Sequence, residues 1–323
     1  MKKMALLTVL LVLFASCRYK DLCYDHNHQL DYNLSLQLDL KLELDVELEV
    51  SEEAHTKIEV PTYMKVCFYD TLTGALKHTA FVGPYGGLIH VAPGTYDMVV
   101  YSFDTEWTRI RGEHLKDSLE AFTSDITATK SSQLSHFAMP KRAGQTDPVI
   151  YTPDHLLVAR KTVEVPPFTL EQQVITVTTS AATLVETYGF EVTNITGIEY
   201  ISSVEAFVTN QARSTFFGRG EKSTEPAIIS FTLEVDRKKG ILKTTFNTFG
   251  KLPGESQSYL HILLTDSEGN VITVTEDITE QFDNPTHEIV IDEPIDIPAP
   301  EGGGGIAPTV EEWENINQDV PIG

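Results

Sequence analysis

The sequence predicts an all-β protein of two tandem β-sandwiches, with few short helices and a C-terminal tail. Three observations predict this class. Apolar and polar residues alternate over 34–50, short β-prone segments follow at regular spacing, and turns rich in Gly and Pro separate them. The sandwiches are expected at 34–160 and 161–297, after a linker at 17–33 and before a tail at 298–323.

The strongest strand signal is the segment 34–50, in which every even position is apolar and every odd position is polar or charged. A period of two places one side of a strand against the core, whereas a helix would scatter these leucines around its surface. One straight strand of this length would run roughly 50 Å, so it could also bend across two pairings. The apolar row is Leu34, Leu36, Leu38, Leu40, Leu42, Leu44, Val46, Leu48 and Val50.

Segment 95–103 is apolar on both faces, which predicts a strand lying between two layers. Segment 266–270, with the sequence Asp-Ser-Glu-Gly-Asn, predicts a hairpin turn in preference to a calcium loop. Helices are expected only at 180–187 and 277–282, and both should be short.

The first residues resemble a bacterial lipoprotein signal. Two lysines precede an apolar run that is too short to span a bilayer, and the small pair Ala15 and Ser16 stands before Cys17. We expect residues 1–16 to be a signal peptide and Cys17 to carry acyl chains of the palmitate kind, which tether without crossing the membrane. The alternative is cleavage near Ala15, with Cys17 left as a plain thiol.

Composition narrows the choice of partners. The chain has 47 acidic and 24 basic residues and a formal net charge of −23. Such a charge repels phosphate backbones, so nucleic acid is not expected as a partner. Solubility at a crowded cell surface explains the acidity more simply than an acidic binding site. Beyond Cys17, an exported compartment permits a Cys23–Cys67 disulfide, although Cys67 also fits a small buried hydrophobe.

The C-terminal tail combines flexibility with apolar side chains. Prolines at 294–300 exclude a central strand, and Gly302–Gly305 form a flexible hinge. A disordered tail would normally lack large apolar residues, so we expect this one to dock onto a partner surface. Its apolar residues are Val310, Trp313, Ile316, Val320 and Ile322.

No catalytic motif, phosphate loop or zinc-type spacing occurs, so neither enzymatic activity nor a cofactor or metal is expected. His26 and His28 lie close together, but an exposed linker explains them better than a metal site that lacks a third ligand. Trp107 lies in an expected loop, where a tryptophan that caps the sandwich is favoured over one that binds sugar.

Several motifs together resemble the fimbrillin-like surface lipoproteins of Bacteroides-type bacteria, which are related to the minor fimbrial anchor and accessory subunits. The resemblance implies two transthyretin-like sandwiches, a lipid anchor in the outer membrane, exposure at the cell surface, and assembly with other fimbrial subunits by strand exchange. The motifs are the lipobox with Cys17, segment 18–24 that contains Lys20-Asp21, the alternating strand, segments 91–96 and 151–157, and the Gly-rich tail with Trp313.

By this resemblance, the row from Leu34 to Val50 corresponds to the first strand, and residues 306–322 form a candidate donor segment. Polymerising subunits of the superfamily are cut after a basic residue, and no convincing arginine site precedes the second strand here. The resemblance therefore implies a structural anchor or accessory subunit rather than a shaft subunit. The alternative is a cell-adhesion module for a glycan or host ligand, with Trp107 or Tyr85 as a stacking platform.

Overall fold

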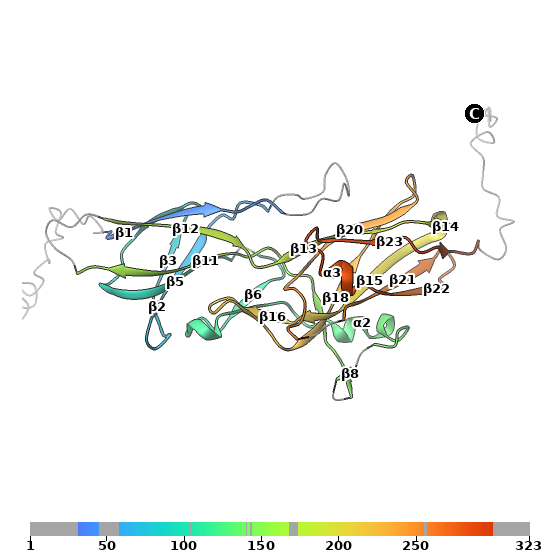
Figure 1. The fold of residues 1–323 in the computed structure, drawn as a ribbon, viewed down its shortest axis with the longest axis horizontal. Coiled ribbons are helices and arrows are strands. Elements are labelled where there is room, and N and C mark those ends of the chain that lie inside the picture. The colour runs from blue at the N-terminus through green and yellow to red at the C-terminus, as the bar shows by residue number, and fades with distance from the viewer. Residues whose placement is uncertain are drawn as a thin grey trace, which may run out of the picture.

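The computed structural model describes residues 32–44, 58–103, 105–139, 141–142, 144–167, 174–254 and 257–299. These residues form an elongated molecule of β-sheets, with sheets of the N-terminal half at one end and sheets of the C-terminal half at the other (Figure 1). The predicted all-β class is confirmed, since only two α-helices and two short 3-10 turns interrupt the described strands.

The first sheet has seven strands in the order β3-β2-β5-β11-β12-β1-β4. Only two residue pairs join β11 to β12, so the sheet splays there and folds into two layers around one core. The short turn 83–85 connects β3 to β4, the two ends of the order. The strands are β1 (Leu34–Leu40), β2 (Met64–Asp70), β3 (Leu76–Val82), β4 (Gly86–Ile89), β5 (Gly94–Ser102), β11 (Leu157–Val165) and β12 (Ile175–Thr183).

The alternation at the start of the chain is confirmed, but the regular strand is short. β1 ends at Leu40, and Leu42 and Leu44 continue the half-buried row beyond it. Residues 46–50 of the predicted row lie outside the described residues. Leu34, Leu36 and Leu38 are buried and contribute to the core between the two layers, as the period of two predicts.

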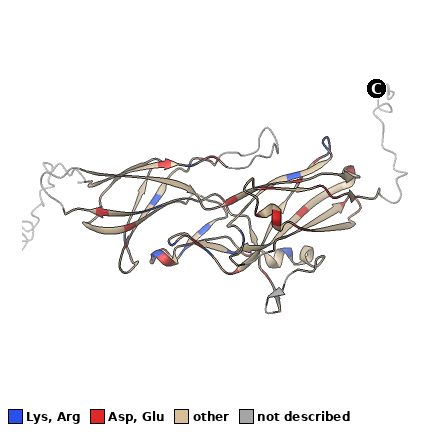
Figure 2. Ribbon diagram, in the orientation of Figure 1, with Lys and Arg blue, Asp and Glu red and all other residues tan. Residues whose placement is uncertain are grey.

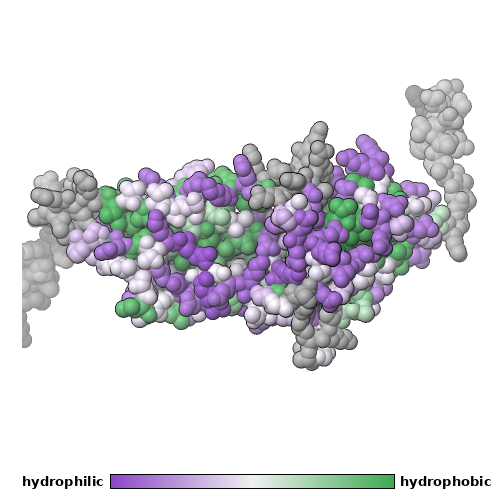
Figure 3. Space-filling model, in the orientation of Figure 1, coloured by the Kyte–Doolittle hydropathy of each residue, from purple (hydrophilic) through white to green (hydrophobic). Residues whose placement is uncertain are grey.

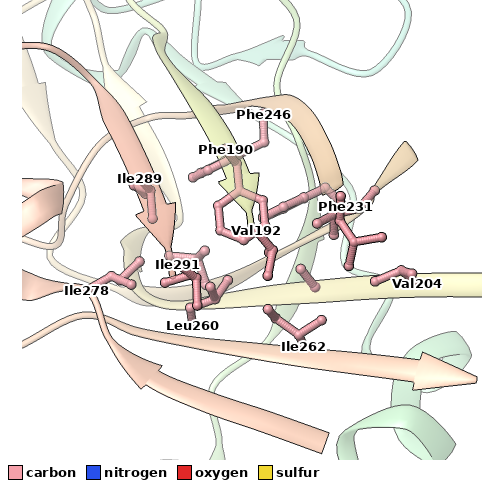
Figure 4. Packing of buried hydrophobic residues seen from close by; sticks show 14 of the residues in the cluster. Phe190, Val192, Val204, Phe231, Phe246, Leu260, Ile262, Ile278, Ile289 and Ile291 are labelled. Atoms are coloured by element: carbon pink, nitrogen blue, oxygen red, sulfur yellow. The ribbon is translucent and has the colours of Figure 1, made fainter. Parts of the chain in front are cut away.

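Two sheets of the C-terminal half pack face to face. Their order is β10-β18-β15-β21-β22 in one and β19-β20-β13-β23 in the other. Aromatic rings fill the space between them: Phe231 stacks on Phe246 with ring centroids 4.3 Å apart, and Phe190 meets Phe231 edge-on (Figure 4). The strands are β10 (Val149–Tyr151), β13 (Glu186–Val192), β15 (Ile201–Ala212), β18 (Pro226–Thr232), β19 (Glu234–Asp236), β20 (Ile241–Thr248), β21 (Tyr259–Asp266), β22 (Val271–Asp277) and β23 (Glu288–Ile291).

A four-stranded junction sheet, β17-β16-β7-β6, joins the two halves. Its strands β6 (Arg109–Arg111) and β7 (Glu120–Phe122) come from the N-terminal half, whereas β16 (Ser214–Phe216) and β17 (Glu221–Lys222) come from the C-terminal half. Beside this sheet, β5 buries Val99 and Tyr101 against residues of both halves. The opposite face of β5, with Met98 and Val100, contributes to the core of the first sheet. The prediction of a strand between two layers is therefore confirmed for β5, which ends at Ser102, whereas Phe103 at the end of the predicted segment is exposed.

Smaller elements complete the structure. The helix α2 (Thr127–Leu134) and β10 pack beside Phe207 and Ile228 of the five-stranded sheet. The remaining elements are the paired strands β8 (Lys141–Arg142) and β9 (Gln145–Thr146), the paired strands β14 (Ile195–Thr196) and β24 (Ile295–Asp296), the helix α3 (Thr279–Phe282), and the 3-10 turns Lys116–Ser118 and Ile198–Tyr200.

The expected domain limits at 34–160 and 161–297 stay a prediction, and two strands are exchanged across them. The strand β12 follows residue 161 but pairs with β1 and β11 in the first sheet. The strand β10 precedes residue 160 but pairs with β18 of the C-terminal half.

The predicted hairpin and one of the two predicted helices are present, and the other helix is not. The hairpin at 266–270 is confirmed, since the Asp266 carboxylate accepts bonds of 2.8 Å from the backbone N–H groups of Glu268 and Asn270. The helix expected at 277–282 is present as the shorter α3. The helix expected at 180–187 is wrong: this segment forms the end of β12 and the start of β13, and Ala181 is buried in the first core.

Replacing Leu36 with alanine tests the inward row. Leu36 is only 2% exposed, so Leu36→Ala should lower the free energy of unfolding by about 2–5 kcal/mol, measured in urea. The exposed neighbour Gln37 supplies the control, and Gln37→Ala should change it by less than about 0.5 kcal/mol. Equal losses in the two variants would contradict the placement of this row in the core.

Candidate functional site

The predicted strand-exchange residues of the first strand lie inside a completed sheet. The strand β1 pairs in parallel with β12 and antiparallel with β4. Leu36 and Leu38 are buried, while Leu40, Leu42 and Leu44 pack half-buried against the same core. The first strand therefore occupies an internal position in the sheet and is not an open edge.

The other predicted sites lie outside the described residues. They are the lipidation site Cys17 and the tail residues Val310, Trp313, Ile316, Val320 and Ile322, and they stay predictions. Cys23 also lies outside, so its pairing with Cys67 is untested. The Cys67 side chain is buried against Tyr101, and this burial raises the pKa of its thiol.

A cleft of about 360 Å³ opens beside the edge strand β3, where β6 passes the outer face of the first sheet. We call it the aromatic–cationic cleft. Phe81 and Phe103 flank it as exposed rings that meet edge-to-face at 5.4 Å, while Lys65 and Arg109 supply positive charge. Its lining is Lys65, Phe81, Tyr101, Phe103, Thr105, Thr108, Arg109, Ile110 and Glu113.

A fixed polar network forms one side of this cleft. Glu113 Oε1 accepts a 2.6 Å bond from Lys65 Nζ and a second bond from the hydroxyl of buried Tyr101. The Tyr69 hydroxyl donates to the backbone carbonyl of Glu113 at 3.0 Å. Lys65 Nζ also lies 6.0 Å from the centroid of the Phe81 ring. The cleft therefore has a preformed shape and a preset charge pattern.

This network sets the protonation of its members. Burial opposes ionisation of Glu113, but the bonds from Lys65 and Tyr101 outweigh it and lower the pKa of the carboxyl. Burial, together with the neighbouring Cys67 and Glu113, raises the pKa of the Tyr101 hydroxyl. Near neutral pH the cleft therefore carries a charged Glu113–Lys65 pair, and Arg109 adds a further positive charge.

Trp107 has a capping role near this cleft. Its ring packs at a tilt of 33° against Tyr151 with centroids 4.4 Å apart, and its backbone N–H donates to the Asp154 carboxylate. The adjacent Thr108 donates its backbone N–H to the same carboxylate. One aromatic face of Trp107 is thus engaged within the chain, which favours the capping interpretation over a sugar platform.

A second cavity of about 430 Å³ lies between the halves, and Asp154, His155, Thr187 and Asn247 contribute to its lining. The two ring nitrogens of His155 contact the hydroxyls of Thr183 and Thr187 at 3.1 and 3.4 Å. The Thr187 hydroxyl donates to the side-chain carbonyl of Asn247. Burial lowers the pKa of His155. His155, Thr187 and Asn247 therefore bond to one another, while Glu59, Glu106 and Thr245 contribute further polar groups to the lining.

Two features are absent from the described part of the chain. It contains no group of three or more His, Cys, Asp or Glu side chains placed to hold a metal ion. Within the same residues, no helix is both long enough and apolar enough to cross a bilayer.

The aromatic–cationic cleft was not found from the sequence, because folding brings its residues together from four separate segments. One signal was present. In β3, the residues at even positions are buried or half-buried and those at odd positions are exposed, yet the odd position 81 holds phenylalanine. A large apolar side chain at an exposed position of a strand is a sequence signal of a binding surface.

The variant Glu113→Gln tests the charge network. The pKa of Glu113 is lowered in the folded state, so its ionised form stabilises the fold above the usual carboxyl pKa, and this contribution is lost as pH falls through the folded-state value. The side chain is partly exposed, so we expect a loss of only about 1 kcal/mol at pH 7. The difference from the unaltered protein should shrink below about pH 4.

Urea unfolding at several pH values measures this effect, and Glu164→Gln is the matched control on the exposed side of β11. A loss in Glu113→Gln that stays constant from pH 7 to pH 3 would contradict the electrostatic account.

The chain is similar to a known protein family and to a known fimbrial protein. A family model described as "Domain of unknown function (DUF5119)" matches residues 16–232. A Bacteroides ovatus protein named "Putative fimbrium anchoring subunit Fim4B" is 23% identical over 301 residues, covering 82% of this chain and 86% of its own. This relative confirms the expected resemblance to fimbrial anchor subunits of Bacteroides-type bacteria.

The fold of the chain resembles that of a solved structure. The crystal structure of a "putative adhesin" from Bacteroides ovatus has a TM-score of 0.56 at 20% identity, covering 84% of this chain and 94% of that chain. The fimbrial anchor protein Mfa2 from Porphyromonas gingivalis has a TM-score of 0.44 at 14% identity, covering 79% and 90%. The all-β architecture is shared with the first of these. Since the family model matches more than half of its residues, the chain belongs to the DUF5119 family.

Proposed function

We propose that this chain is a structural fimbrial subunit of the anchor or accessory type, tethered by lipid to the outer membrane and joined to its partners by β-strand addition. The relative named as a fimbrium anchoring subunit supports the fimbrial part of the proposal, since its similarity extends over most of both chains. That relationship also supports a structural role over an enzymatic one.

The internal position of β1 in its sheet is the main observation that supports an anchor or accessory role. Because β1 bonds to strands on both sides and buries its leucines, this sheet already contains the strand that a neighbour would otherwise supply. No arginine occurs between residues 19 and 108, where a cut after arginine would have to release it. The chain is therefore suited to offer a segment rather than to lose its first strand.

The tether rests on the N-terminal sequence. Cys17 would carry the acyl chains, and the Lys20-Asp21 pair resembles an export tag for the cell surface. About 15 residues separate Cys17 from Tyr32, and an extended chain of that length reaches at most roughly 50 Å. Such a linker would hold the β-sheets clear of the lipid headgroups while keeping them close to the membrane.

The segment offered to a partner would be the tail. The strand β24 ends at Asp296, and the Gly302–Gly305 hinge separates it from the apolar residues that follow. In β-augmentation, backbone hydrogen bonds supply affinity and alternate side chains supply specificity. Pro308 and Pro321 limit the usable length to the residues between them, because proline cannot donate to a ladder.

The variant Cys17→Ser tests the tether. The protein should move from the membrane fraction to the soluble fraction, and mass spectrometry should find no acyl chains at its mature terminus. An unaltered protein that already lacks acyl chains would rule out lipid tethering while leaving strand addition open.

Deleting residues 306–323 tests the tail. We expect cells to make normal amounts of the truncated protein but to fail to incorporate it into surface filaments, because the donor segment is gone. Immunogold electron microscopy measures incorporation, and a flow-cytometry signal from the same antibody controls for surface export. Filaments that carry the truncated protein at the usual frequency would exclude the tail as the donor.

A further inference from the structure

The aromatic–cationic cleft exposes two phenylalanine rings that contact each other. Phe81 is 61% exposed and Phe103 is 40% exposed, although their rings already contact each other. Single apolar side chains on a surface need no explanation, but paired aromatic rings beside a cavity match the composition of interface centres. Apolar residues also show over the first sheet in Figure 3, whereas polar residues dominate near the junction. The cleft thus offers a place for another aromatic side chain.

The charge of the cleft contrasts with that of the protein. Of its three charged residues, Lys65 and Arg109 are positive and only Glu113 is negative, whereas the whole chain carries a formal charge of −23. Acidic and basic residues are scattered over both halves in Figure 2. Since Glu113 already bonds to Lys65, Arg109 is the cation that would meet an acidic ligand.

The cleft also borders a sheet edge. The strand β6 is the last strand of the junction sheet, and among the described strands it pairs only with β7. Its outer backbone groups can therefore pair with an added extended segment. A ligand that is extended, acidic and aromatic would satisfy the cleft in all three respects.

One segment of this chain has that chemistry. Residues 309–314 read Thr-Val-Glu-Glu-Trp-Glu, so a tryptophan stands among three carboxylates. The chain has two tryptophans, and the other, Trp107, packs against Tyr151. An indole fits edge-to-face or offset against phenylalanine rings and also attracts cations over its face.

The position of the tail favours a second molecule over the tail of the same chain. The strand β24 pairs with β14, which lies at the far end of the molecule from the first sheet (Figure 1). About 14 residues separate the last described residue from Trp313, and they reach at most roughly 50 Å when fully extended. Docking on the next molecule needs no such stretching around the surface.

We propose that the aromatic–cationic cleft binds residues 309–314 of a second copy of this chain, with Trp313 against Phe81 and Phe103 and the carboxylates toward Arg109. The inference rests on the proposed role of the tail as a donor and names its receptor. The contact joins two different surfaces, so it is head-to-tail and pairs one copy with a neighbouring copy.

The test uses the full mature chain carrying Cys17→Ser, which removes the lipid without altering the described residues. A labelled peptide of residues 306–323 should bind it saturably in fluorescence anisotropy, and the chain should self-associate with concentration in sedimentation velocity. Either Phe81→Ser or Arg109→Glu in the chain should weaken peptide binding by about tenfold or more, as should Trp313→Ala in the peptide.

Matched controls separate the cleft from general surface effects. Leu72→Ser replaces a 94% exposed leucine in the turn after β2, and Lys238→Glu reverses an exposed charge far from the cleft. Both should bind the peptide normally. A peptide carrying Glu311→Lys and Glu312→Lys should bind Arg109→Glu better than it binds the unaltered protein.

The outcomes distinguish this inference from the proposed function. A chain that stays monomeric and does not bind the peptide would overturn the inference, as would binding that Phe81→Ser and Arg109→Glu leave unchanged. If the tail deletion nevertheless abolished filaments in cells, the tail would remain a donor whose receptor lies elsewhere. Normal filaments after that deletion would instead remove the donor role itself.

Discussion

The burial of β2 and β5 on both faces is the constraint on which the rest of the structure depends. Phe68 and Met98 point into the core between the layers of the first sheet, while Tyr69 and Tyr101 point the other way. A strand that is apolar on both sides must be covered on both sides. Residues of the C-terminal half, including Phe217, supply the second cover, with its ring 5.2 Å from that of Tyr101. The two halves therefore share a buried interface.

The residues of the aromatic–cationic cleft lie where the second layer that covers β2 and β5 ends. Tyr101 lies at the margin of the shared interior, and its hydroxyl bonds to Glu113. That carboxylate then needs a cation, which Lys65 supplies from the neighbouring strand. One strand farther out, Phe81 has lost the cover and stands exposed. The aromatic–cationic cleft is thus a direct consequence of a two-sided strand pair whose second layer stops short of the sheet edge.

Sequence patterns predicted the features that depend on local periodicity. The alternation around Leu36 gave the correct inward face, and the apolar run around Tyr101 gave the correct two-sided burial. Sequence patterns gave the wrong secondary structure where pairing with a distant segment determines it. Segment 180–187 contains helix-compatible alanines, but pairing of Ala181 with Leu40 and of Ala182 with Val158 holds it in a strand. The pairing of β10 with β18 and the position of Arg109 beside Phe81 likewise depend on contacts that no short window of sequence contains.

The placement of β1 bears on which segment can be exchanged between subunits. Removing β1 would break its ladder with β12 over seven residue pairs and its ladder with β4 over four. It would also expose Leu34, Leu36 and Leu38, and each buried leucine is worth about 1.5–3 kcal/mol. Gly86 reinforces the arrangement, because a Cβ there would stand 2.0 Å from the carbonyl oxygen of Leu36, so only glycine lets β4 approach β1 so closely. Transferring β1 to a neighbour would therefore cost the fold both ladders and this buried surface, which agrees with a donor segment that lies outside this sheet, as we propose for the tail.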